Sequence, residues 1–474
     1  MLHSRRLALA VLCTGALMAI VDETIVAVSL PAIQRDLGFS KAGLAWVTGA
    51  YLIAFAGLLL LSGRLGDLVG RKRVFLSGLA VFTVASAMCG LAWNAQALVV
   101  ARFAQGVGGA ALTAVILGMI VTLFPQPADR ARAIGAFSFV QASGGTIGTL
   151  AGGLITQVAS WHWIFFLNVP IGIIAVLLAC RLLATEPGLG LDKGADIAGA
   201  ALVTASLMAG IYTIIRVEEV GWASAHTAGF GALSLLLLAA FVLRQVTAAD
   251  PLLTPRLLRS RPVLGANAVL FLLVASMFGF MFVTVLNLRN VLGFSPRDTG
   301  FAVAPVAVAI AVVSLSVAPR LNVRFGERRV LPAGLVVISS ALGLLGLAPA
   351  DAEYPTQVLP ALLLLGIGFG AAMPALLALG MSGAEPKDSG LASGLFNTTQ
   401  QLGAALGLSV LLVLAATRAD RLMADGATTT AALLAGYQLV YRVAAATVLL
   451  ALLITVTMLR GFRRRTRQPA AAAS

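Results

Sequence analysis

The sequence predicts an all-α polytopic membrane protein with fourteen membrane-spanning helices and both termini in the cytoplasm. Three observations support this prediction: the composition, the number of long apolar runs, and the distribution of basic residues between these runs. Hydrophobic residues make up 59% of the 474 residues and charged residues 11%, less than half the charged share of an average soluble domain. Such a chain cannot cover its own surface with polar side chains, so we expect a lipid bilayer to surround it.

A membrane-spanning helix needs about 20 predominantly apolar residues. The chain contains fourteen runs of this kind, at 7–30, 44–63, 74–93, 96–123, 133–157, 161–183, 195–215, 225–244, 262–288, 299–319, 330–348, 356–380, 390–416 and 437–459. The first run follows Arg5 and Arg6, as the apolar core of a signal peptide does. It is longer than the roughly 15 apolar residues of a signal peptide and has no small-residue cleavage site, so we interpret it as the first span.

Basic residues alternate between the two sides of the predicted membrane. Of the 33 Lys and Arg residues, 24 lie in the even-numbered gaps and the two tails, with Arg181 and Arg244 at the ends of their spans counted among them; 7 lie in the odd-numbered gaps, and Arg102 and Arg442 lie well inside spans. Cytoplasmic loops carry the excess of Lys and Arg, so this alternation places both termini in the cytoplasm and the protein in the cell inner (cytoplasmic) membrane. The net charge of +14 therefore reflects topology, and we expect no nucleic-acid partner.

Two pairs of similar segments indicate an internal repeat. Residues 64–74 read RLGDLVGRKRV after the second span, and residues 320–330 read RLNVRFGERRV after the tenth. Residues 105–111, QGVGGAA, resemble residues 365–372, LGIGFGAA, in the twelfth span. The repeat relates spans 1–6 to spans 9–14. We predict a six-helix N-terminal half at 1–184, two inserted helices at 185–250, and a six-helix C-terminal half with a basic cytoplasmic tail at 251–474. Duplicated halves of this kind are typical of secondary transporters.

Three motifs resemble those of one family. Residues 63–72, GRLGDLVGRK, resemble the loop signature of the major facilitator superfamily. Residues 22–31, DETIVAVSLP, resemble the first-span motif of its fourteen-span drug:proton antiporter family, and residues 102–106, RFAQG, resemble a fourth-span motif. The chain resembles this family over nearly its whole length.

The resemblance implies the major facilitator fold and a proton-coupled antiporter that exports lipophilic, often cationic drugs, antibiotics or biocides by alternating access. It implies the proton motive force as the energy source, no cofactor, and a functional monomer in the lipid bilayer. The loop signature implies a cytoplasmic gate that holds the outward-facing state. This gate comprises Gly63, Arg64, Asp67, Gly70, Arg71 and Lys72.

The fifth span resembles the antiporter signature of the same family. Residues 144–153 read GGTIGTLAGG, and the matching glycines are Gly144, Gly148, Gly152 and Gly153. Thr149 stands where the family has proline. In the following segment, residues 161–170, His162 replaces the family's arginine. Closely spaced glycines allow two helices to approach each other.

Asp22 and Glu23 are the only acids well inside a predicted span. Ionisable groups within a membrane are costly, so each is a functional candidate. Arg102 lies at a similar depth in the fourth span, and we expect it to face one of these acids. Adjacent helical residues point about 100° apart, so one acid would face Arg102 and the other the substrate cavity. Asp22 occupies the acidic position of the family motif. We therefore predict that Asp22 carries the proton. Glu23 is the second candidate for this role and a candidate ligand of cations.

Competition between a proton and a cationic substrate for one carboxylate would couple the two flows. The alternative is that Asp22 and Arg102 form a purely structural ion pair.

Polar and aromatic residues elsewhere are candidates for the substrate cavity. The polar candidates are Gln105, Asn397, Gln400 and Gln401. The aromatic candidates are Phe137, Phe139, Phe278, Phe280, Phe282 and Phe396. The thirteenth span contains no acid, which argues against export of divalent cations.

Other functions are compatible with a multi-span chain. One alternative is a dedicated exporter of a single endogenous metabolite, and another is a membrane sensor that does not transport. A membrane enzyme would need a cluster of His, Cys or carboxylate side chains, and the sequence contains neither such a cluster nor a metal-ligand spacing. It also lacks the G-x-x-x-x-G-K-[ST] loop that ATP-driven export requires.

Overall fold

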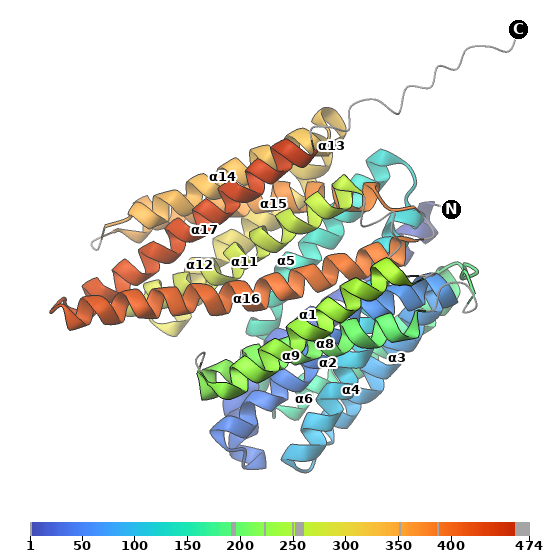
Figure 1. Cartoon of the computed structure of the whole chain (residues 1–474), viewed down its shortest axis with the longest axis horizontal. Helices are drawn as coiled ribbons and strands as arrows, with labels where there is room; N and C mark the ends of the chain where they lie inside the picture. The colour runs from blue at the N-terminus through green and yellow to red at the C-terminus, as the bar shows by residue number, and fades with distance from the viewer. Residues whose placement is uncertain are drawn as a thin grey trace, which may run out of the picture.

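The computed structural model describes residues 2–459 apart from 191–195, 222–223, 249–250, 252–259, 350–351 and 386–387. These residues form helices and no strands (Figure 1). The helices of the N-terminal part are α1 (Leu2–Leu37), α2 (Lys41–Val69), α3 (Arg71–Gly90), α4 (Ala95–Leu123), α5 (Pro127–Val158), α6 (His162–Phe166), α7 (Asn168–Leu182), α8 (Ile197–Val220) and α9 (Ala225–Thr247). Those of the C-terminal part are α11 (Arg261–Asn290), α12 (Pro296–Val312), η1 (Val313–Val317), α13 (Ala318–Phe325), α14 (Glu327–Leu347), η2 (Tyr354–Val358), α15 (Leu359–Ser382), α16 (Ser389–Ala424) and α17 (Thr429–Leu459).

Each of the fourteen predicted spans coincides with one helix or with consecutive helices. Thirteen helical segments of the described chain are long and apolar enough to cross a membrane, and α5, with 32 residues, occupies the remaining predicted span. The first run is a single helix, as predicted. The basic tail beyond Leu459 and the gap residues Lys193, Arg256, Arg259 and Lys387 lie outside the described residues.

Two predicted spans are interrupted. The sixth is divided into α6 and α7 at Leu167. The tenth contains α12, the π-helical turn η1 and α13. Proline has no backbone N–H and cannot continue the helical hydrogen-bond ladder. Pro170 lies just inside α7 and Pro319 at the start of α13, which explains both interruptions.

The structure shows the repeat as a pair of equivalent glycine contacts. Gly108 on α4 packs against the backbone of Gly78 and Phe82 on α3, and Gly368 on α15 packs in the same way against Gly334 and Ile338 on α14. The two loops that the repeat identified are also alike: Gly70 ends α2 at φ 109° and Gly326 ends α13 at φ 79°. Positive φ favours glycine, so the same turn chemistry recurs in each half.

The two inserted helices pack mainly on each other and on α2. Ser206 on α8 and Ser234 on α9 exchange hydrogen bonds with each other's backbone carbonyls, at 2.8 and 2.9 Å. Asp196 precedes α8 and accepts hydrogen bonds from the backbone N–H of Gly199 and from Arg244 Nε of α9, at 2.8 and 2.6 Å. These contacts join the pair at its midpoint and at its cytoplasmic end.

The two halves contact each other near the end of the molecule where α1 begins and α17 ends (Figure 1). Gly63 on α2 packs against Gly390 and Gly394 on α16, and Gly118 on α4 packs against Ser389. On the other side of the interface, α5 contacts α12, η1, α13 and α15. The helices of the two halves diverge towards the opposite end in Figure 1.

Candidate functional site

A polar cluster lies inside the N-terminal half, where α1, α3, α4 and α7 meet. At its centre Arg102 Nη1 donates to Asp22 Oδ2 at 2.5 Å, and both residues are fully buried. Gln105 Nε2 and Asn168 Nδ2 donate to Asp22 Oδ1 at 2.7 and 3.2 Å. Ser86 Oγ accepts from the same two amides, at 3.1 Å each. Asp22 therefore accepts three hydrogen bonds in a region closed to solvent.

Hydrogen bonds and two aromatic rings surround the Arg102 guanidinium. Its Nε donates to the backbone carbonyl of Val47 at 3.0 Å, and its Nη1 also donates to Gln105 Oε1 at 2.7 Å. Its Cζ lies 4.4 Å from the centre of the Tyr51 ring and 5.8 Å from that of Phe165. A buried guanidinium is stable only with a counter-charge and satisfied donors, and Asp22 supplies that charge.

The sequence predicted that Arg102 faces one of the two acids, and the structure shows that this acid is Asp22. Gln105 had been assigned to the substrate cavity, but it lies in the polar cluster and does not line the cavity. Its spacing from Arg102 explains this, since residues i and i+3 share one face of a helix. The sequence analysis did not identify Ser86 or Asn168, although Asn168 belongs to the 161–170 segment that resembles the family motif.

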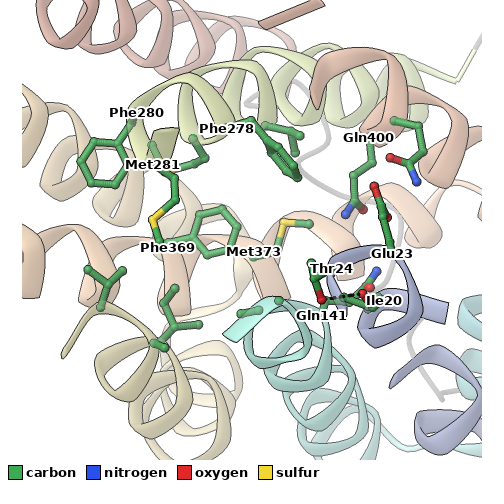
Figure 2. A pocket seen from close by; sticks show the side chains of 18 of the residues that line it. Ile20, Glu23, Thr24, Gln141, Phe278, Phe280, Met281, Phe369, Met373 and Gln400 are labelled. Carbon is green, nitrogen blue, oxygen red and sulfur yellow. Dashed lines mark hydrogen bonds between the residues drawn. The ribbon is translucent and has the colours of Figure 1, made fainter. Parts of the chain in front are cut away.

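A cavity of about 450 Å³ lies between the two halves. Its polar end carries Glu23, Thr24, Gln141 and Gln400 (Figure 2), and Asn397 and Gln401 also line the cavity. Glu23 is the only charged residue among the described residues that line it. Figure 2 shows Glu23 on α1 next to Gln400 on α16. Asn397, Gln400 and Gln401, three of the polar residues that the sequence suggested for a substrate cavity, line this cavity.

The other end of the cavity is formed by aromatic and thioether side chains (Figure 2). These are Phe278, Phe280, Met281, Phe369 and Met373; Phe55 and Met277 also line the cavity. Aromatic rings and methionine provide an apolar, polarisable surface for flat apolar groups. Of the predicted aromatic residues, Phe278 and Phe280 line the cavity, whereas Phe137, Phe139, Phe282 and Phe396 do not. Phe137 and Phe396 are buried in the protein core instead.

A second set of charged residues lies at the cytoplasmic contact between the halves. Asp67 on α2 accepts hydrogen bonds from the backbone N–H groups of Gly390 and Leu391 at the start of α16, at 2.9 and 2.7 Å. The N-terminus of a helix carries unpaired N–H groups and a partial positive charge, so it binds a carboxylate well. Arg71 forms ion pairs with Asp67 and with Glu186, each at 3.2 Å.

The remaining gate residues surround this contact. Arg64 is buried, and Lys72 Nζ donates to the backbone carbonyl of Cys180 at the end of α7, at 2.9 Å. The backbone of Glu186 approaches Gly70 so closely that a Cβ there would lie 2.8 Å from its carbonyl oxygen. Nothing in the sequence pattern had identified Glu186.

The glycines of the fifth span pack against α1. A Cβ at Gly144 would lie 2.6 Å from the Ile20 side chain, one at Gly148 would lie 2.8 Å from the Val21 carbonyl oxygen, and one at Gly152 would lie 3.0 Å from the Ile25 carbonyl oxygen. Thr149 and Gly153 lie in α5, but their surroundings are outside the described part of the structure. The close approach of α5 positions the segment of α1 that carries both acids.

Two six-helix halves around a central cavity, inside a bundle of apolar spanning helices, define a secondary membrane transporter. The family model of the Major Facilitator Superfamily matches residues 12–408. The chain belongs to this superfamily, and it is a multi-pass membrane protein.

Its relatives include resistance and export proteins. It is 35% identical over 452 residues to the puromycin resistance protein pur8 of Streptomyces alboniger, covering 95% of this chain and 90% of that protein. It is 39% identical over 412 residues to the cephamycin export protein CmcT of Amycolatopsis lactamdurans, covering 85% and 84%. The structure of the human organic anion transporter MFSD10 (TETRAN) has the same fold, with a TM-score of 0.66, 17% identity, and coverage of 95% of this chain and 99% of that one.

Proposed function

We propose that the protein is a proton-coupled antiporter that exports lipophilic, cationic drugs or antibiotics across the cytoplasmic membrane. The observation that carries this proposal is the cavity between the halves, which has one carboxylate at its polar end and an aromatic and methionine surface at the other. A carboxylate attracts a cation, and the apolar end removes flat hydrocarbon surface from water. Relatives named for resistance and export support the same direction of transport.

The contacts between the halves support a mechanism of alternating access. Asp67 and the glycines at the start of α16 close the cytoplasmic side, so this arrangement corresponds to an outward-facing state. In the opposite state these contacts would open and the cavity would face the cytoplasm. Movement of one half against the other around a fixed site is the way in which transporters with repeated halves work.

Proton coupling would follow from competition at the acids of α1. Facing outward, an empty cavity would take up a proton. Facing inward, a cationic substrate would favour the ionised carboxylate and release that proton to the cytoplasm. This exchange of a proton for a substrate breaks no covalent bond in the substrate, so we propose that the protein is a transporter and not an enzyme.

A second candidate function is export of one dedicated metabolite. The names of two relatives favour it, since CmcT is a cephamycin export protein and another relative, 33% identical over 411 residues, is a tetracenomycin C resistance and export protein of Streptomyces glaucescens. These names describe the two relatives and not this chain. The carboxylate of Glu23 in the cavity favours cationic substrates, so we place general export of cations first.

The proposed function is tested by expression in a host that lacks its own efflux pumps. We expect higher resistance to several lipophilic cations, such as ethidium and tetraphenylphosphonium, and extrusion of ethidium that stops when a protonophore is added. Empty vector and a panel of neutral and anionic antibiotics serve as controls. Resistance to one compound only, with no cation exported, would favour the dedicated exporter.

A further inference from the structure

We infer that Glu23, rather than Asp22, is the carboxyl group that exchanges a proton for a cationic substrate, while Asp22 stays ionised as the fixed counter-charge of Arg102. This inference rests on the proposed function and assigns the coupling chemistry to one residue. The family motif had suggested Asp22 as the first candidate for the proton and Glu23 as the second, and this inference reverses that ranking.

The first argument is access. Adjacent helical positions point about 100° apart, and the structure shows the result: Asp22 faces the polar cluster while Glu23 lines the cavity. Asp22 is fully buried and is not among the residues that form the cavity wall. A substrate in the cavity would therefore meet Glu23 first, and water could reach Glu23 without opening the cluster.

The second argument is the occupancy of the two carboxylates. Asp22 Oδ2 accepts from Arg102, and Asp22 Oδ1 accepts from Gln105 and Asn168. A proton on Asp22 would lie among groups that donate hydrogen bonds and would leave the buried Arg102 without a counter-charge, which is strongly destabilising.

The carboxyl group of Glu23, by contrast, makes no hydrogen bond or ion pair with the described residues. Gain and loss of a proton at Glu23 would therefore break no hydrogen bond or ion pair in the described part of the chain.

The third argument is the orientation of Gln105. Its Oε1 accepts from Arg102, and this contact turns its amide so that Nε2 donates to Asp22. Arg102, Gln105 and Asn168 thus all present donors to Asp22, an environment that stabilises a charged carboxylate. Asp22 and its partners act as positioning residues, because they fix the α1 segment that presents Glu23.

The stoichiometry follows from charge balance. The Asp22–Arg102 pair is neutral, which leaves Glu23 as the one titratable charge among the described residues that line the cavity. A monovalent cation leaving the cell would then exchange for about one entering proton, and that exchange moves no net charge. A divalent cation would move one net charge outward, against the membrane potential.

Proton release on substrate binding tests this assignment. Full-length protein in detergent, in weak buffer with a pH-sensitive dye, should release about one proton for each ethidium bound. Glu23→Gln should release at least about tenfold less, because the described residues that line its cavity then include no titratable group. The double variant Asp22→Asn with Arg102→Met removes both charges of the ion pair, so the net charge of the cluster does not change. This variant should still release about one proton for each ethidium bound. Release by Glu23→Gln at the wild-type ratio, or binding of ethidium to the double variant without release, would overturn the inference.

A labelling experiment gives a readout that does not depend on export. Dicyclohexylcarbodiimide reacts with protonated carboxyl groups in apolar surroundings, so peptide mass spectrometry should locate the adduct on Glu23, and ethidium should protect it. An adduct on Asp22 and not on Glu23 would refute the assignment. If wild-type protein exports ethidium without any proton release, the proton coupling of the proposed function fails, and this result is distinct from a wrong choice between the two acids.

Discussion

Asp67 Oδ2 on α2 accepts a hydrogen bond of 2.7 Å from the backbone N–H of Leu391, a residue 324 positions further along the chain. This contact and its neighbour from Gly390 attach a carboxylate of one half to the N-terminus of α16 in the other. Since the inward-facing state requires these bonds to break, their strength sets part of the balance between the two states.

Replacing Asp67 with Asn should weaken this contact and shift the population towards the inward-facing state. Hydrogen bonds to a charged group contribute about 1.5–3 kcal/mol, so the ratio of the two states should change roughly 10- to 100-fold. The shift can be measured with a cysteine in place of Gln400, in a background without the three native cysteines. Labelling of that cysteine by a membrane-impermeant maleimide from outside should slow down.

Glu186→Gln is the matched control for the Asp67 variant. Its side chain is 48% exposed and forms an ion pair with Arg71, so the effect should be below about 1 kcal/mol. Equal labelling of the Asp67→Asn variant and the wild type would show that the carboxylate does not hold the cytoplasmic side closed.

A methyl group at Gly63 should hinder closure of the same side. The added Cβ would lie 2.5 Å from the carbonyl oxygen of Gly390 and 3.0 Å from Gly394 Cα. Overpacking typically costs 1–3 kcal/mol, so Gly63→Ala should lower the ethidium efflux rate about tenfold. Gly343→Ala introduces the same group on α14, where nothing lies within 4 Å, and should transport normally. Wild-type efflux by the Gly63 variant would refute the close contact.

Replacing Phe369 with Ala should lower the affinity for aromatic cations. Phe369 lines the apolar end of the cavity (Figure 2), and loss of its ring removes about 1–3 kcal/mol of apolar contact. The dissociation constant for ethidium, measured by fluorescence with purified protein, should rise roughly 5- to 100-fold. Phe282→Ala removes an aromatic ring that is 45% exposed and does not line the cavity. Equal affinities of the two variants would mean that the substrate binds elsewhere.

Acid should weaken the contact between the inserted helices. Burial raises the pKa of Asp196, but hydrogen bonds from the Gly199 backbone, Arg244 and Gln245 outweigh it, so the net pKa is lowered from 3.8. A depressed pKa in the folded state adds stability above the unfolded-state pKa, and this contribution is lost as the pH falls through the folded-state value.

Thermal unfolding can test this effect. Asp196→Asn should have a lower Tm than the wild type at pH 6, and the difference should shrink below about pH 4. A difference that stays constant down to pH 3 would show that the charge of Asp196 does not contribute.

The sequence predicted much of the fold because membrane helices have a simple requirement, a long apolar run with basic residues on the cytoplasmic side. It also predicted that Asp22 and Glu23 would point to different places, since helix geometry alone separates them. Which acid faces Arg102 depends on how α1 is rotated against α4, and no local pattern determines that rotation.

Other parts of the site required the three-dimensional structure for similar reasons. Ser86 and Asn168 join the polar cluster from α3 and α7, and a single polar residue in an apolar helix does not indicate its partner. Glu186 reaches Arg71 from a segment that follows α7, a contact set by the path of the loop. Gln105 could have been assigned correctly, because it lies one helical turn from Arg102.

The most direct test of the account uses purified protein in vesicles that contain ethidium. With an acidic exterior and no membrane potential, we expect the proton gradient to drive ethidium out against its concentration gradient. A potassium–valinomycin potential of either sign should change this rate little, because one proton replaces one cation. Propidium, with the same ring system and a second positive charge, should respond to the potential. Ethidium transport that ignores the pH gradient, or that follows the potential alone, would contradict exchange at a single carboxylate.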